Sequence, residues 1–116
     1  MAKRARRQAK LSAPTSDYTD AEGNVLTLRG ALTPATRAQY GELLAGNVLS
    51  REDAWHRAVE FLFERLAVRW EISGAPIERQ RELLARFRVA STGERAWVRE
   101  VLREHCAEYF PELQTP

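Results

Sequence analysis

The spacing of apolar residues predicts that most of the chain is helical. From residue 34 onward, apolar side chains recur every three or four positions, which places them on one face of an α-helix. Start and stop signals divide this region, because Ser, Thr or Pro favours a helix start and Gly or a following Pro favours an end. The predicted helices span about residues 34–45, 51–73, 76–90 and 92–110.

A short β-hairpin is predicted ahead of these helices. Its strands contain residues 18–19 and 25–28, and its turn contains the Gly and Asn of residues 22–24, which tolerate the backbone angles of tight turns. An isolated hairpin is marginally stable in water, so Leu26 and Leu28 must lie against the helices or a second chain. The predicted fold class is therefore mainly α, with about four helices around a central long helix and a short N-terminal β-hairpin.

The predicted helix of residues 51–73 has two apolar stripes instead of one. The main stripe consists of Trp55, Val59, Leu62, Phe63, Leu66 and Trp70, and the second consists of Ala54, Phe61, Val68 and Ile72. The simpler interpretation is that the chain's own helix 34–45 or its hairpin covers the second stripe. The alternative is a seam for another molecule, with Phe61, Val68 and Ile72 as the partner-binding residues. Leaving each such side chain in water would forgo about 1.5–3 kcal/mol of burial, so we expect the stripe to be covered.

The net charge of +2 conceals an uneven distribution. The first thirteen residues carry five basic side chains and no acidic one, so the remainder of the chain is net negative. We expect residues 1–16 to form a disordered basic arm and residues 17–113 a single helical domain. The arm is either a solubilising terminus or a weak, sequence-independent nucleic-acid contact. Its basic residues are Lys3, Arg4, Arg6, Arg7 and Lys10.

Candidate chemistry is sparse along the sequence. Asp53 and His56 have the spacing of a metal-binding pair but no matching pair elsewhere, so we expect a surface pair of His56 with Glu60 and no metal. His105 lies in the apolar face of the last predicted helix, where we expect a partly buried ring with hydrogen-bonded nitrogens. Cys106 points away from it, and no nucleophile elbow or phosphate loop occurs. We therefore expect neither an enzyme nor a cofactor.

The last predicted helix carries charged rows on both sides of its apolar face. The arginine row is Arg95, Arg99 and Arg103, and the glutamate row is Glu100, Glu104 and Glu108. Because the two rows share one helix, we expect them to organise contacts with other helices or with water rather than to read DNA.

Together these features indicate a non-enzymatic, small helical protein-interaction module, which binds a protein partner or forms a homodimer through the second stripe. A nucleic-acid-associated protein that binds phosphates through its arm is the alternative. No stretch is long and apolar enough for a membrane helix, no secretory signal is visible and Cys106 is the single cysteine, so we expect a cytoplasmic protein. The excess of arginine over lysine and the abundant alanine suggest a GC-rich bacterial genome.

Overall fold

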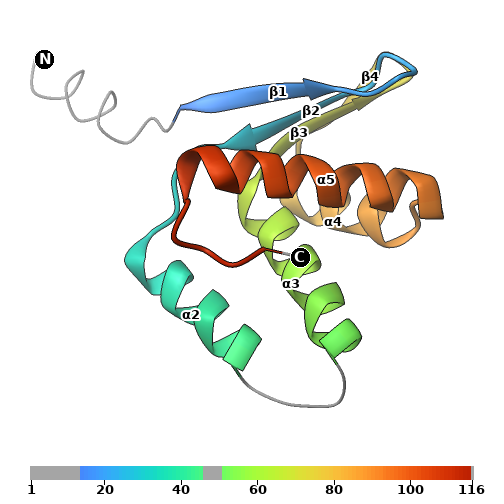
Figure 1. Ribbon diagram of the computed structural model, residues 1–116. Coiled ribbons are helices and arrows are strands. Elements are labelled where there is room, and N and C mark those ends of the chain that lie inside the picture. The colour runs from blue at the N-terminus through green and yellow to red at the C-terminus, as the bar shows by residue number, and fades with distance from the viewer. Residues whose placement is uncertain (1–13, 46–50, 116) are drawn as a thin grey trace, which may run out of the picture.

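The protein combines helices with an antiparallel sheet, as the computed structural model shows for residues 14–45 and 51–115 (Figure 1). The mainly α prediction is wrong, because the described residues form four helices and a four-stranded sheet, an α+β arrangement. The strands are β1 (Thr15–Thr19), β2 (Val25–Arg29), β3 (Ala67–Ile72) and β4 (Ala75–Ile77). The helices are α2 (Pro34–Ala45), α3 (Arg51–Leu66), α4 (Gln80–Arg88) and α5 (Thr92–Tyr109).

The sheet has the order β1-β2-β3-β4, and every neighbouring pair is antiparallel. One row of paired residues crosses all four strands, and it consists of Tyr18, Leu26, Trp70 and Ile77. Leu26 and Trp70 are buried, so this row faces the core. The predicted hairpin is therefore half of a larger sheet, and β3 supplies part of the cover that Leu26 requires.

Residues 67–77 account for the error in fold class. The predicted helix 51–73 ends at Leu66, and Ser73-Gly74, which resembles a helix C-terminus, is instead the two-residue turn between β3 and β4. Ser73 and Gly74 have φ angles of 52° and 78°, as the hairpin turn whose twist matches that of the flanking strands requires. Pro76, predicted to open a helix, lies in the short edge strand β4, where it removes no hydrogen bond from the sheet interior.

Several local start and stop signals were predicted correctly. The side chain of Thr33 accepts a hydrogen bond from the Thr36 N–H at the start of α2. Ser91 and Glu94 form the predicted capping box of α5, with both reciprocal hydrogen bonds present. Gly23 has a φ angle of 86° in the β1–β2 turn. The predicted capping box at Ser50 lies outside the described residues.

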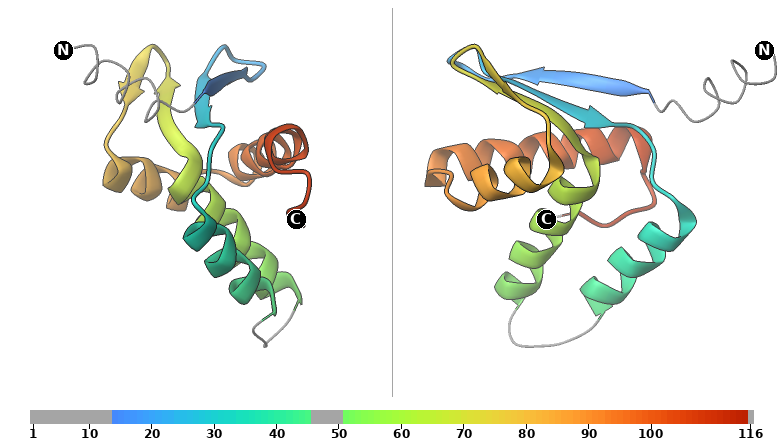
Figure 2. Two further views of the ribbon diagram at one scale, coloured as in Figure 1. Left: turned by 90° about the vertical axis from the view of Figure 1, so that its left-hand side faces the viewer. Right: turned by 180° about the vertical axis from the view of Figure 1, so that it is seen from behind.

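The helices lie on one side of the sheet, as the three views show (Figures 1 and 2). α5 runs below β1 and β2, and α4 lies below β3 and β4. α2 and α3 form an antiparallel pair that extends away from these two helices. The core lies between the sheet and the helices, where Phe63 of α3 stacks on Phe87 of α4 with 4.8 Å between ring centroids and meets Trp70 edge-on.

The C-terminal segment ties the α2–α3 pair back to the end of α5. Phe110 is buried, and the Arg37 guanidinium lies 5.2 Å from its ring centroid. Arg37 also pairs with Glu112, and the Tyr40 hydroxyl donates a 2.6 Å hydrogen bond to the carbonyl of Gln114. In the part of the chain that the structure describes, no helix has the length and apolar character needed to cross a membrane.

Candidate docking groove

The three residues predicted as a partner-binding seam do not share a helix face. Phe61 lies on α3, whereas Val68 and Ile72 lie on β3. Phe61 is half-buried and lies 6.0 Å from the ring of Tyr40 on α2, measured between centroids, so α2 covers part of it. Ile72 also packs against the core. Val68 is half-buried and lies where the β2–β3 register shifts, without a paired residue on β2.

The basic residues assigned to the nucleic-acid alternative, Lys3, Arg4, Arg6, Arg7 and Lys10, lie outside the described residues. Thr15 and Ser16, at the end of the predicted arm, belong to β1. The nucleic-acid interpretation of the arm therefore stays a prediction.

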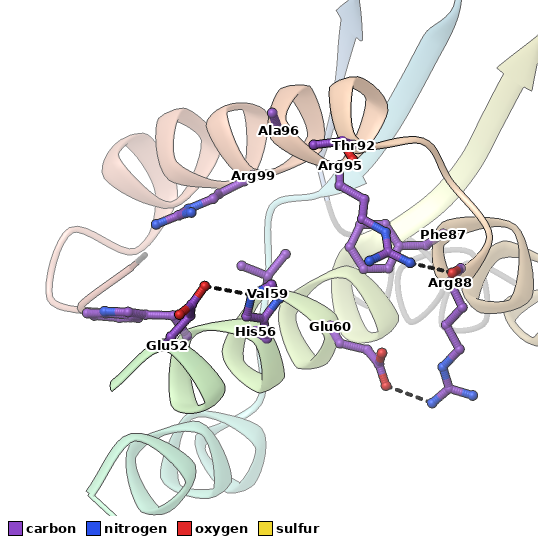
Figure 3. Close-up of a pocket in the computed structure, with 11 residues that line it drawn as sticks. Glu52, His56, Val59, Glu60, Phe87, Arg88, Thr92, Arg95, Ala96 and Arg99 are labelled. Carbon is purple, nitrogen blue, oxygen red and sulfur yellow. Dashed lines mark hydrogen bonds and ion pairs between the residues drawn. The ribbon is translucent and has the colours of Figure 1, made fainter. Parts of the chain in front are cut away.

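A groove of about 750 Å³ opens where α3 diverges from α5, with the end of α4 closing one end (Figure 3). α3 contributes Glu52, Trp55, His56, Val59 and Glu60; α4 contributes Phe87 and Arg88; α5 contributes Thr92, Arg95, Ala96 and Arg99. A space of this volume lies within the usual range of ligand and anchor-residue sites.

The floor of the groove is apolar. Val59 and Phe87 are less than a tenth exposed, Trp55 is half-buried and the Ala96 methyl group lies on the α5 wall. Val59 and Trp55 belong to the main stripe predicted for the central helix. Since α3 turns away from α5, this end of the stripe borders an open space instead of a helix.

Two acidic side chains line the groove, and one of them has a cationic partner. Glu60 of α3 accepts a 2.7 Å hydrogen bond from Arg88 of α4, and this interaction raises the pKa of Arg88. His56 lies 3.9 Å from Glu52. The predicted pair of His56 with Glu60 is therefore wrong, because Glu60 pairs with Arg88 and His56 lies beside Glu52, one helical turn before it.

The α5 wall of the groove is cationic. Arg95 and Arg99 extend from α5 into the space that faces α3 (Figure 3). Arg95 donates a hydrogen bond to the backbone carbonyl of Arg88, a neutral acceptor. Arg99 is exposed and makes no hydrogen bond or ion pair with any residue that the structure describes. Neither guanidinium is neutralised by a carboxylate within the described chain.

His105 is the one buried polar residue among the described side chains, and its hydrogen bonds hold α5 to the sheet. Its Nε2 lies 2.8 Å from the carbonyl oxygen of Arg29, which can only accept, so Nε2 carries the proton. Nδ1 then accepts the hydrogen bond from the Tyr18 hydroxyl at 2.8 Å. Burial lowers the pKa of His105, although the Arg29 carbonyl and Glu108 oppose this effect. Both ring nitrogens are engaged, as expected from the sequence, and neither is free for proton transfer.

Other candidate chemistry is weak in the described residues. Burial raises the pKa of Cys106 to about 12, so its thiol stays protonated and is a poor nucleophile. Burial also raises the pKa of Tyr18 to about 12, with a smaller contribution from Glu108. No group of three or more His, Cys, Asp or Glu side chains lies close enough together to hold a metal ion within the described ranges.

The sequence does not predict the groove, although it predicts on which helix faces several of the lining residues lie. Trp55, Val59 and Phe87 were placed correctly on apolar helix faces, and Arg95 and Arg99 on an exposed row. The angle between α3 and α5 determines whether such faces close on each other, and no local sequence signal encodes this angle. The nearest available signal is that the two charged rows of α5 have opposite signs, so that a surface facing the arginine row is next to positive charge alone.

Comparisons with protein-family models, with curated proteins and with solved structures found no match to the chain.

Proposed function

We propose that this protein is a non-enzymatic interaction module that binds a segment of another protein in the groove between α3, α4 and α5. The observation that carries the proposal is an apolar floor beside two arginines without carboxylate partners. Interaction sites typically combine apolar anchors with a charged rim, and Trp and Arg are the residues most often found at their energetic centres. Trp55 and Arg99 supply this combination.

The described residues favour this site over the seam predicted from sequence. Trp55, Phe61 and Ile72 are all partly buried and pack against the core, but Trp55 alone of the three lines the groove. There it lies beside the edges of Val59 and Phe87, so a partner side chain in the groove can contact all three.

Site-specific photo-crosslinking tests the proposal. A photoreactive residue replaces Ala96, which lines the groove, or Ala85, an exposed alanine on α4 outside it, in the full chain expressed in its own host cell. We expect Ala96 to yield a discrete adduct that contains a second protein and Ala85 to yield none. Adding Trp55→Ala to the Ala96 probe should weaken the adduct, because it removes the half-buried apolar side chain that a partner would contact in the groove.

Two results would contradict the proposal. Equal labelling from Ala96 and Ala85, or none from either, would mean that the groove is not a docking site. An adduct of twice the 13.3 kDa chain mass would identify a second copy of the chain in place of another protein.

A further inference from the structure

The charges in the groove define the chemistry of the segment that would bind there. Glu60 is engaged with Arg88, whereas Glu52 keeps its negative charge beside His56, which is charged only when protonated, so the α3 wall has one carboxylate without a cationic partner. The α5 wall retains two guanidinium groups without carboxylates. An incoming segment therefore meets a net attraction if it is acidic and a net repulsion if it is basic.

The spacing of the two arginines adds a geometric requirement. Arg95 and Arg99 are four residues apart on α5, which corresponds to a rise of about 6 Å along the helix axis. Two carboxylates that are four residues apart on a second helix have the same separation. An extended strand offers a similar spacing for residues two apart, so spacing alone does not choose between them.

Backbone hydrogen bonding favours a helix over an extended strand as the bound segment. All lining residues from α3 and α5 lie within helices, where only first-turn N–H groups such as those of Glu52 and Thr92 lack a partner in the helix, and no open strand edge borders the groove. An extended segment would place its own N–H and C=O groups against an apolar floor without partners. A helix satisfies these groups internally and presents only side chains to the groove.

A second copy of the chain does not supply such a helix from its described residues. The glutamate row of α5 has suitable charges, but Val98, Val101 and Leu102 of the same helix are buried in the core. The glutamates therefore lack a free apolar face beside them. α5 of a second copy is therefore unsuitable, and we assign the segment to another protein.

We infer that the groove binds an amphipathic, acidic helix of a partner protein, with two carboxylates one turn apart against Arg95 and Arg99 and an apolar side chain on the floor beside Trp55 and Phe87. This inference rests on the proposed function and specifies the partner's chemistry.

Synthetic helical peptides provide the test. Three peptides of about 15 residues share one apolar face and matched helicity, and differ in carrying glutamate, glutamine or lysine at two polar positions one turn apart. Fluorescence anisotropy of labelled peptides measures their affinity for the full chain. We expect the glutamate peptide to bind most tightly and the lysine peptide least, with the difference shrinking as salt is raised.

Charge reversal on the protein completes the experiment. Arg95→Glu with Arg99→Glu should lower the affinity for the glutamate peptide by about tenfold or more and raise the affinity for the lysine peptide. The matched control is Arg79→Glu with Arg81→Glu, which changes the net charge equally at exposed positions outside the groove and should leave the ranking unchanged. Because Arg95 also donates a hydrogen bond to the Arg88 carbonyl, Arg99→Glu alone repeats the test without removing a side-chain hydrogen bond or ion pair from the described chain.

The outcomes separate the inference from the proposed function. If the glutamate peptide binds no more tightly than the lysine peptide, or if both charge-reversal variants affect it equally, the acidic-helix inference is wrong. A groove-specific adduct from Ala96 would in that case still support docking of a different kind of segment. Absence of that adduct would contradict the proposed function itself.

Discussion

His105 shows how one buried polar residue connects distant parts of the chain. Its two ring nitrogens bond Tyr18 of β1 and the Arg29 carbonyl at the end of β2, so α5 is fixed to both strands of the first hairpin. Tyr109 lies beside the ring with 4.6 Å between centroids, and its hydroxyl bonds Ser16 at 2.8 Å. Such a fully bonded network stabilises the fold only while His105 is neutral.

Stability should therefore decrease in mildly acidic solution. The pKa of His105 is lowered from 6.5 in the folded chain, so the unfolded chain binds the proton first as the pH falls. The contribution of His105 is fully present above pH 6.5 and decreases below it. Urea unfolding between pH 7.5 and 5 should show this loss. His105→Gln should be less stable, but its free energy of unfolding should change less with pH over this range. An equally steep dependence in His105→Gln would contradict this assignment.

The Tyr18 hydroxyl should also matter for stability. Tyr18→Phe leaves His105 Nδ1 buried without its donor, which we expect to cost about 1–3 kcal/mol of unfolding free energy. Tyr109→Phe removes a hydroxyl bond between half-buried residues, where water can substitute, and should cost less. Urea denaturation of both variants measures the difference, and equal losses would mean that the buried Nδ1 is not the cause.

At the scale of elements, short-range signals were predictable and long-range pairing was not. Ser91 with Glu94 and Thr33 with Pro34 define helix starts within a few residues, so the sequence suffices there. Residues 67–72 fit both the helical and the strand spacing of apolar residues. Trp70 lies four residues after Leu66, as on one face of a helix, and it is also two residues from Val68 and from Ile72, as on one face of a strand. Pairing with β2, about forty residues earlier in the chain, decides the outcome in favour of a strand.

The β3–β4 turn offers a test of that correction. Gly74 has a φ angle of 78° and nothing lies within 4 Å of an added Cβ, so Gly74→Ala should cost about 1 kcal/mol through backbone conformation alone. Ser73→Asn creates the Asn-Gly pair that this turn favours and should stabilise the chain by a few tenths of a kcal/mol, roughly. Thermal unfolding compares the two. Gly74→Ala would also destabilise a helix that ended at Gly74, because a glycine in that position has a positive φ angle. Ser73→Asn is therefore the discriminating variant, since it should not raise stability if residues 67–73 were helical.

At the scale of the whole molecule, the sheet determines where the helices diverge. α4 and α5 pack below the strands, while α3 leads directly into β3 and must leave the sheet at the angle of its connection (Figure 2). This divergence opens the groove, and it depends on the complete fold. The apolar and basic residues of the groove were therefore recognisable from the sequence, but their arrangement around one open space was not.

The two arginines of the groove should contribute little to folding. Arg95 and Arg99 are exposed, so replacing both with Glu should change the free energy of unfolding by about 0.5 kcal/mol or less. Leu62→Ala, at a fully buried position of α3, should cost about 2–5 kcal/mol. Chemical denaturation measures both. A large loss in the double arginine variant would mean that these side chains serve the fold instead of a partner.

The three tryptophans allow the site of peptide binding to be located within the protein. The chain has three tryptophans, and among them Trp55 lines the groove, while Trp70 is buried in the core and Trp97 lies outside the groove. Their indole N–H signals report separately in a two-dimensional NMR titration with the glutamate peptide. We expect the Trp55 signal to move in proportion to bound peptide while the Trp70 and Trp97 signals stay in place. Saturating peptide that shifts Trp97 or leaves Trp55 unchanged would contradict docking in this groove.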